Sequence, residues 1–150
     1  MHQVMRFNEL AASRAAHEAG ISPAIFHSEP GVLVLEYLDA KTLSAEEVRS
    51  PNYLPRVVDL IGRCHRDIQL HLRGPVLVFW VFHVIRDYAN ALREWESRLL
   101  DQVPRYLHIA ETLEAAVGSI DLVFGHNDLL AANFIDDGDK LWLIDWEYAG

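Results

Sequence analysis

The feature that most constrains this chain lies in its last 26 residues. Residues 125–133 read Gly-His-Asn-Asp-Leu-Leu-Ala-Ala-Asn, and residues 141–147 read Leu-Trp-Leu-Ile-Asp-Trp-Glu. Between them, Asp-Asp-Gly-Asp at 136–139 is typical of a hairpin turn. We therefore expect two short strands, 133–135 and 141–144, in a hairpin that carries a carboxylate, an amide and a second carboxylate.

These three polar groups are Asp128, Asn133 and Asp145. Protein kinases place a catalytic-loop Asp and two metal ligands with this spacing. Transfer of a phosphoryl group requires one carboxylate to accept the proton of the attacking hydroxyl. It also requires a carboxylate and an amide oxygen to hold Mg²⁺ against the nucleotide phosphates. The three residues supply these groups in the required order.

Two motifs of this sequence resemble the choline/ethanolamine kinase branch of the aminoglycoside-phosphotransferase-like superfamily. They are His126-Asn127-Asp128-Leu129 with Asn133, and Ile144-Asp145-Trp146-Glu147-Tyr148-Ala149-Gly150. Asp-Trp-Glu in place of a protein kinase's Asp-Phe-Gly favours a small-molecule kinase. Asn127 and the Glu-Tyr-Ala run favour choline-type over aminoglycoside-type members. The resemblance implies an enzyme that uses ATP and Mg²⁺ to transfer the γ-phosphoryl group to the hydroxyl of a small amino-alcohol.

The resemblance also assigns roles within the two motifs. Asp128 is the expected catalytic base, and Asn133 and Asp145 are the expected Mg²⁺ ligands. We expect His126 to brace the loop through hydrogen bonds more than to take part in the chemistry. Glu147 is expected near the metal or the substrate.

Further from these motifs, Glu9 occupies the place of the kinase glutamate that pairs with a phosphate-binding lysine. The backbone of Glu36 to Leu38 is expected to form the hinge that meets the adenine edge. The only lysines are Lys41 and Lys140, and neither follows a strand upstream of Glu9. No Gly-x-Gly occurs for a phosphate-covering loop. We therefore expect either a piece of a longer kinase or a degenerate paralogue. The intact Asp128, Asn133 and Asp145 favour the piece, which we expect to be inactive by itself.

The expected fold class is α+β, a partial protein-kinase-like fold. Residues 1–38 would be the end of the N-lobe, a helix and a β-hairpin, with the hinge. Residues 39–150 would be a helical C-lobe with the catalytic-loop hairpin. An unpaired sheet edge before the first hairpin would favour self-association.

Hydrophobic periodicity and turn residues predict the individual elements. Asn8 is expected to cap a helix that Gly20 closes, and residues 32–35 to form a strand buried on both faces. A capping box at Ser44–Glu47 opens a second helix. Further helices are expected over 54–72, 84–99 and 104–117, and further strands over 24–27 and 122–124. Residues 76–82 fit a strand or a packed loop. The helix over 54–72 has one apolar stripe, formed by Leu54, Val57, Val58, Ile61, Cys64, Ile68 and Leu72.

Composition excludes some classes of function. Half of the 150 residues are hydrophobic, as in a globular domain, and the net charge of −9 argues against nucleic acid or an anionic membrane as partner. The charge suits a cationic alcohol. One cysteine, Cys64, excludes an internal disulfide. Without a signal sequence or a long apolar run, we expect a cytoplasmic protein.

Several alternatives stay open. An aminoglycoside or a thiamine-type alcohol is an alternative substrate, and a non-catalytic nucleotide-binding pseudokinase is an alternative protein class. A metal-dependent hydrolase that uses His126, Asp128 and Asp145 is disfavoured, because no second ligand lies at the required spacing. Trp142 and Trp146 could cage a quaternary ammonium, but Trp142 alternates with Leu141 and Leu143, so packing in the core is expected.

Overall fold

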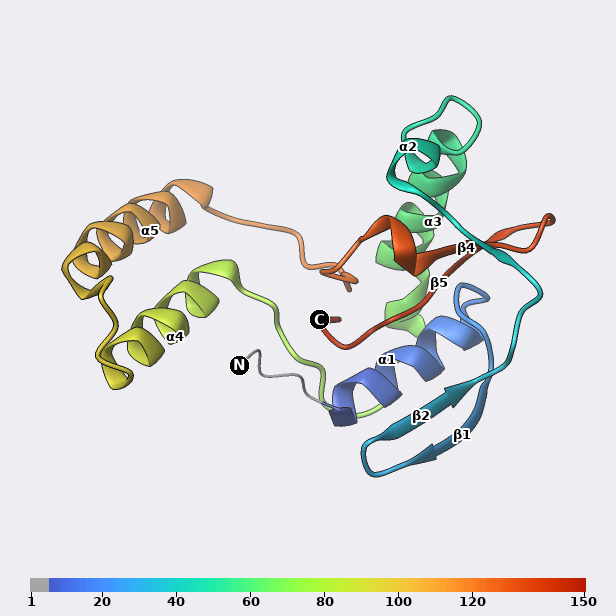
Figure 1. The fold of residues 1–150 in the computed structure, drawn as a ribbon, viewed down its shortest axis with the longest axis horizontal. Coiled ribbons are helices and arrows are strands. Elements are labelled where there is room, and N and C mark those ends of the chain that lie inside the picture. The colour runs from blue at the N-terminus through green and yellow to red at the C-terminus, as the bar shows by residue number, and fades with distance from the viewer. Residues whose placement is uncertain (1–5) are drawn as a thin grey trace. The chain divides into compact units, whose positions relative to one another are not determined.

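The computed structural model describes residues 6–150 and contains both helices and antiparallel sheets, which confirms the expected α+β class (Figure 1). The chain divides into two compact units. The first comprises the residues up to Leu77 together with Val123–Gly150, and the second comprises Val78–Leu122. All predicted site residues belong to the first unit.

The first helix, α1 (Arg6–Glu18), ends at a glycine as expected. Gly20 has a φ of 69°, and its N–H donates to the carbonyl of His17 at 2.8 Å. The next N–H, of Ile21, donates to the carbonyl of Ala16 at 2.8 Å. This pair of bonds is a Schellman ending. The prediction that Asn8 caps the helix is wrong, because Asn8 lies inside α1 and its side chain makes a tertiary hydrogen bond.

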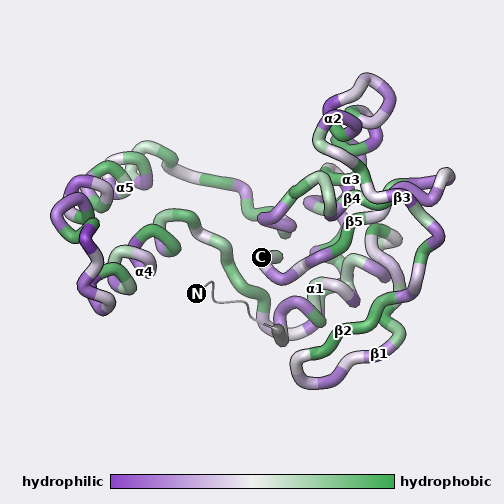
Figure 2. Tube along the Cα trace, viewed as in Figure 1, coloured by the Kyte–Doolittle hydropathy of each residue, from purple (hydrophilic) through white to green (hydrophobic). Residues whose placement is uncertain are grey.

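Strands β1 (Ile25–Glu29) and β2 (Val32–Leu35) form an antiparallel two-stranded sheet around a Pro30-Gly31 turn. Gly31 has a φ of 84°, as the second central residue of this turn requires. The prediction that β2 is buried on both faces is wrong. Its sequence is continuously hydrophobic (Figure 2), yet Val32 and Val34 are 45% and 40% exposed, because a two-stranded sheet leaves one face without a covering layer.

The second sheet has the order β3-β4-β5 and contains the predicted hairpin. Strands β4 (Phe134–Asp136) and β5 (Leu141–Leu143) pair antiparallel, and β3 (Lys41–Thr42), which was not predicted, pairs with β4. The carboxylate of Asp137 orders the turn, because it accepts from the N–H groups of Asp139 and Lys140 at 2.9 and 2.8 Å. These bonds depress the pKa of Asp137.

The interpretation of Trp142 as a core residue needs correction. Leu141 and Leu143 are buried, whereas Trp142 is only half-buried. Its indole N–H donates to Asp137 at 2.6 Å, and the Lys140 ammonium lies 3.4 Å from the ring centroid. Because successive side chains of a strand point to opposite faces of the sheet, Trp142 lies on the face opposite to Leu141 and Leu143.

Short helix α2 (Ala45–Val48) has the predicted capping box, and α3 (Leu54–Asp67) follows, continued by a 3₁₀ turn, η1 (Ile68–Leu70). The apolar stripe of α3 is only partly as predicted. Leu54 and Val58 are exposed, and Leu60 is buried instead. The buried face thus includes one position that the predicted stripe left out.

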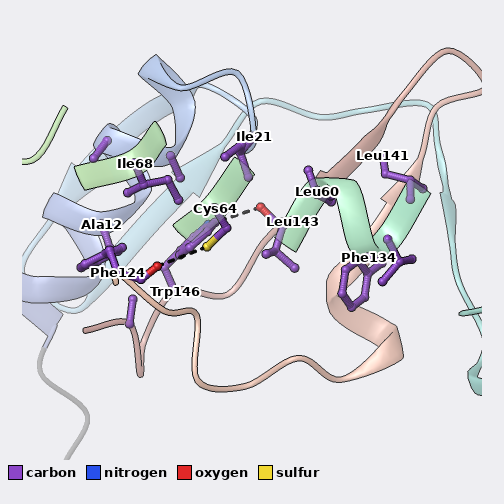
Figure 3. Close-up of a cluster of buried hydrophobic side chains, with 14 of the residues drawn as sticks. Ala12, Ile21, Leu60, Cys64, Ile68, Phe124, Phe134, Leu141, Leu143 and Trp146 are labelled. Carbon is purple, nitrogen blue, oxygen red and sulfur yellow. Dashed lines mark hydrogen bonds between the residues drawn. The ribbon is translucent and has the colours of Figure 1, made fainter. Parts of the chain in front are cut away.

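A single hydrophobic core joins α1, α3 and the second sheet (Figure 3). Its largest fully buried side chains include Trp146, Phe134, Ile21, Ile68 and Leu143. Cys64 belongs to this core, where its thiol lies 3.6 Å from the Phe124 carbonyl, and burial raises its pKa to about 12.

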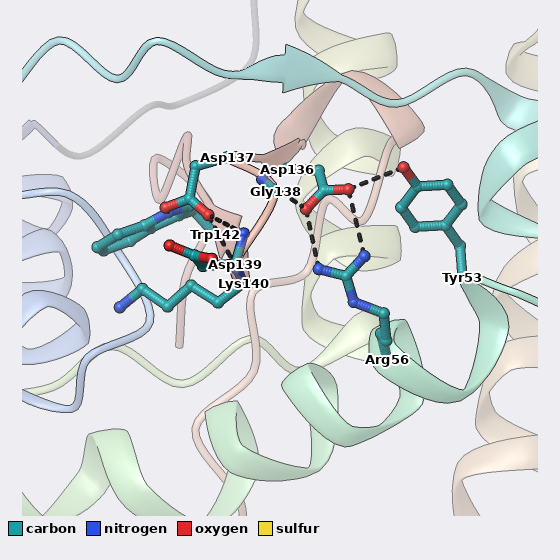
Figure 4. A network of polar contacts seen from close by, with 8 residues as sticks. All are labelled: Tyr53, Arg56, Asp136, Asp137, Gly138, Asp139, Lys140 and Trp142. Carbon is teal, nitrogen blue, oxygen red and sulfur yellow. Dashed lines mark hydrogen bonds and ion pairs between the residues drawn. The ribbon is translucent and has the colours of Figure 1, made fainter.

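A polar network fastens the β4–β5 hairpin to α3 (Figure 4). The Asp136 carboxylate accepts from both terminal nitrogens of Arg56, at 2.8 and 3.2 Å, and from the Tyr53 hydroxyl at 2.8 Å. The Arg56 guanidinium depresses the pKa of Asp136. A bidentate pair of this kind fixes the angle of the hairpin as well as its position.

The second unit is a helical hairpin of α4 (Val81–Glu94) and α5 (Val103–Val117), with a 3₁₀ turn, η2 (Leu100–Gln102), before α5. Arg86 forms an ion pair with Glu114 across the two helices. Gly118 ends α5 as predicted, with a φ of 67°. Residues 76–80 contain no strand, and the strand expected at 122–124 is absent. No helix within residues 6–150 combines the length and the apolar content needed to cross a bilayer.

Candidate functional site

His126 contacts both motifs of the predicted site and is 1% exposed. Its Nε2 is 2.8 Å from the carbonyl of Ile144, and its Nδ1 accepts the N–H of Asp128 at 3.2 Å. One ring thus contacts the backbone at the proposed base and the residue before Asp145. These two contacts link the loop to the second motif, and the bracing role of His126 stays a prediction.

The partners of His126 also fix its tautomer. A backbone N–H can only donate and a carbonyl can only accept, so the proton resides on Nε2 and Nδ1 carries the lone pair. Burial lowers the pKa of His126, although the nearby charges of Asp128 and Asp145 partly oppose this effect. The ring also stacks at a tilt on Trp146, with 4.6 Å between centroids. A neutral imidazole is therefore the stable form.

Asn133 makes a second connection between the motifs. It ends the 3₁₀ turn η3 (Ala131–Asn133) and is 6% exposed. Its amide nitrogen donates to the carbonyl of Asp128 at 2.9 Å, and its own carbonyl accepts the N–H of Ile144 at 3.1 Å. Because the amide nitrogen is used, the side-chain oxygen is the atom that could ligate a cation.

Asp145 has an exposed carboxylate on an unusual backbone, with a φ of 71°. Asn127, in the other motif, has a φ of 63°. L-residues rarely adopt this region, and Asn and Asp tolerate it best. Such conformations persist only where the surroundings enforce them, and they concentrate at functional sites.

The segment after Asp145 is anchored by residues that the sequence did not single out as site residues. The buried amide of Asn8, on α1, donates to the carbonyl of Ala149 at 2.6 Å. The amide of Asn127 donates to the carbonyl of Tyr148 at 3.0 Å. The N–H of Gly125 donates to the carbonyl of Gly150 at 2.9 Å. An asparagine within an alanine-rich helix was the only signal for the first of these.

Of the remaining predicted site residues, Glu147 belongs to the second motif, and the other three lie elsewhere in the first unit. Glu9 lines a groove of about 410 Å³ between α1 and the β1–β2 turn. Glu36 follows β2, and its N–H donates to the carbonyl of Ala24 at 2.8 Å. Leu38 is half-buried, as is Glu147. The roles of these four residues stay predictions.

The donor set fits the chemistry of Mg²⁺. The Asp145 carboxylate and the Asn133 amide oxygen are hard oxygen ligands, and Mg²⁺ takes its other ligands from phosphates and water. Within residues 6–150, no three side chains of His, Cys, Asp or Glu form a cluster suited to a metal ion by themselves.

The chain is similar in sequence to known proteins. The family model for choline/ethanolamine kinase matches residues 1–150. Ethanolamine kinase 2 of Rattus norvegicus is 27% identical over 155 residues, covering 98% of this chain and 40% of its own length. The chain thus spans about two fifths of that relative.

Solved structures share the fold. The choline/ethanolamine kinase family protein of Mesorhizobium loti matches with a TM-score of 0.78 and 30% identity, covering 99% of this chain and 50% of its own. LicA in complex with AMP matches with a TM-score of 0.58 and 21% identity, covering 99% and 51%. The expected kinase-like fold, present in part, is thereby confirmed.

Proposed function

Because the chain belongs to the choline/ethanolamine kinase family, we propose that it supplies the catalytic loop and metal-binding segment of an ATP- and Mg²⁺-dependent kinase. The enzyme transfers the γ-phosphoryl group to the hydroxyl of a small amino-alcohol of the choline or ethanolamine type. The net charge of −9 is compatible with a cationic acceptor.

One observation carries this proposal: the two motifs are held together by direct hydrogen bonds. The His126 ring joins the Asp128 backbone to Ile144, and Asn133 joins the same two segments through its side chain and its carbonyl. Two carboxylates and one amide oxygen are therefore presented from one connected unit. Phosphoryl transfer depends mainly on positioning and on charge stabilisation, which such a unit provides.

In the proposed reaction, the Asp128 carboxylate orients the acceptor hydroxyl and takes its proton. The hydroxyl oxygen forms a bond to the γ-phosphorus while the bond from that phosphorus to the ADP oxygen breaks, and ADP leaves. The Asn133 amide oxygen and the Asp145 carboxylate would hold Mg²⁺. When bound, Mg²⁺ neutralises charge on the phosphate oxygens.

Three further assignments complete the proposal. The backbone of Glu36 and Leu38 would meet the adenine edge. Glu9 would pair with a lysine that contacts phosphate, and Glu147 would lie near the metal or the acceptor. The AMP complex of the structural neighbour LicA supports nucleotide use within this fold.

The test is a coupled assay of ADP release with ethanolamine, choline, thiamine and an aminoglycoside as acceptors. We expect little turnover by residues 1–150 alone, because neither lysine of this sequence lies where a phosphate-binding lysine is needed. A longer chain that contains these residues should phosphorylate the amino-alcohols. There Asp128→Asn should reduce kcat about 100-fold or more. Near-normal turnover by this variant would exclude Asp128 as the base.

A further inference from the structure

Three consecutive backbone carbonyl groups after Asp145 accept hydrogen bonds from other parts of the chain. The carbonyl of Tyr148 accepts from Asn127, that of Ala149 accepts from Asn8, and that of Gly150 accepts from the N–H of Gly125. Two of these donors come from the segment just before Asp128. The third, Asn8, comes from α1, 141 positions away from its acceptor in the sequence.

Asn8 differs from its neighbours on α1. It is 3% exposed, and the other buried residues between positions 8 and 18 are alanines and one serine. Asparagine is a poorer helix former than alanine, because its side chain competes for backbone groups. The compensating interaction here is the 2.6 Å hydrogen bond to the buried Ala149. Without that donor, a buried carbonyl would be left unpaired.

The backbone is held in the same way before Asp145. The N–H of Leu143 donates to the carbonyl of Ile21 at 3.0 Å, just beyond the end of α1. Ile144 is bonded to both His126 and Asn133. Asp145, with its φ of 71°, thus lies between two anchored stretches of backbone. The hydrogen bonds on both sides restrain this left-handed conformation.

We infer that Asn8 is a positioning residue for the carboxylate of Asp145, acting through the backbone of residues 146–150. This inference rests on the proposed function, in which Asp145 ligates Mg²⁺. Asn8 touches neither metal nor substrate in this account. It couples the position of α1, which carries the adjacent Glu9, to the direction in which Asp145 presents its oxygens.

The test uses Asn8→Leu in residues 1–150, because leucine has nearly the same shape and lacks the donor. Val57→Ala is the control for general destabilisation. It removes buried side-chain volume from the hydrophobic core on α3, and the Val57 side chain forms no hydrogen bond to residues 143–150. Affinities for MgATP and for adenosine are measured by calorimetry. Amide hydrogen exchange is followed at Leu143 and Gly150, whose N–H groups are bonded within this region.

We expect Asn8→Leu to weaken MgATP binding about 10-fold, the scale of effect that follows the removal of a group that orients a metal ligand. Adenosine affinity should stay at the parent value, and exchange at Gly150 should accelerate more than in Val57→Ala. Equal effects of the two variants on both readouts would overturn the inference. If the parent itself shows no Mg²⁺-dependent binding, the proposed function fails; the exchange comparison alone then supports or overturns the positioning role of Asn8.

Discussion

The amide nitrogen of Asn133 donates a 2.9 Å hydrogen bond to the backbone carbonyl of Asp128. The proposed metal ligand therefore also shapes the loop that carries the proposed base. By contrast, the Asp145 carboxylate is exposed. The two proposed metal ligands should consequently respond differently to substitution.

Asn133→Ala should both weaken MgATP binding and lower stability, by about 1–2 kcal/mol, because the Asp128 carbonyl loses its donor. Asp145→Ala should weaken MgATP binding with a smaller loss of stability. Adenosine binding should be barely changed in either variant. Calorimetric titration combined with urea unfolding separates these effects, and a matching loss of adenosine affinity would indicate a folding defect instead.

The positive φ of Asp145 allows a test of backbone strain. Because its φ is 71°, glycine suits this position better than any other residue. Asp145→Gly should be more stable than Asp145→Ala by about 1 kcal/mol, although neither binds Mg²⁺ with the nucleotide. Equal unfolding free energies of the two variants would show that the left-handed backbone carries no strain.

Acidic pH should destabilise the site through His126. Burial lowers the pKa of this side chain in the folded state, so its stabilising contribution is complete above the unfolded value of about 6.5. That contribution is lost as the pH falls below 6.5 towards the folded pKa, because the unfolded state then binds the proton more readily. A protonated Nδ1 also cannot accept the Asp128 N–H.

The measurement is the free energy of unfolding from pH 8 to pH 5. His126→Gln is the control, since its amide can donate to Ile144 and accept from Asp128 without titrating. The parent should lose more stability than this variant over that range. Parallel pH profiles would contradict a buried neutral histidine.

The Asp136 network should stabilise the hairpin. Asp136→Asn should lower the free energy of unfolding by about 1–2 kcal/mol, since it removes a charge-assisted bidentate pair that is partly exposed to solvent. Asp139→Asn, in the exposed part of the same turn, should have almost no effect. The contribution of Asp136 should disappear only in acid below its unfolded pKa of about 3.9, far from the window of His126.

Gly125 should be intolerant of a side chain. A Cβ atom there would lie 2.9 Å from the Asn127 side-chain oxygen, so Gly125→Ala should displace this amide from Tyr148 and weaken MgATP binding. Gly62→Ala is the matched control. It also places a Cβ atom 2.9 Å from a side chain, but the atom met is the end of the flexible Arg66. Thermal melting and MgATP titration of both variants test this difference.

The sequence predicted those features that depend on local chemistry. The positions of glycine and proline residues correctly predicted the end of α1, the Pro30-Gly31 turn and both ends of α5. The turn residues at 136–139 located the β4–β5 hairpin. These signals succeed because each one depends on a few neighbouring residues.

Features that depend on distant partners were predicted less well. Asn8 has the local pattern of a helix cap, and only its contact with Ala149 shows another use. The hydrophobicity of β2 indicated burial, but burial depends on whether another layer covers the strand. The pairing of β3 with β4 joins residues more than 90 positions apart, and no local pattern signals it.

The most direct test of the account is a titration of residues 1–150 with ATP, with Mg²⁺ and in its absence, beside the same pair of titrations for Asp145→Ala. If Asp145 and Asn133 hold a cation against the nucleotide phosphates, Mg²⁺ should strengthen ATP binding to the parent about 10-fold or more. The same addition should leave the affinity of the variant unchanged. Equal strengthening by Mg²⁺ in parent and variant would contradict the assignment of this site.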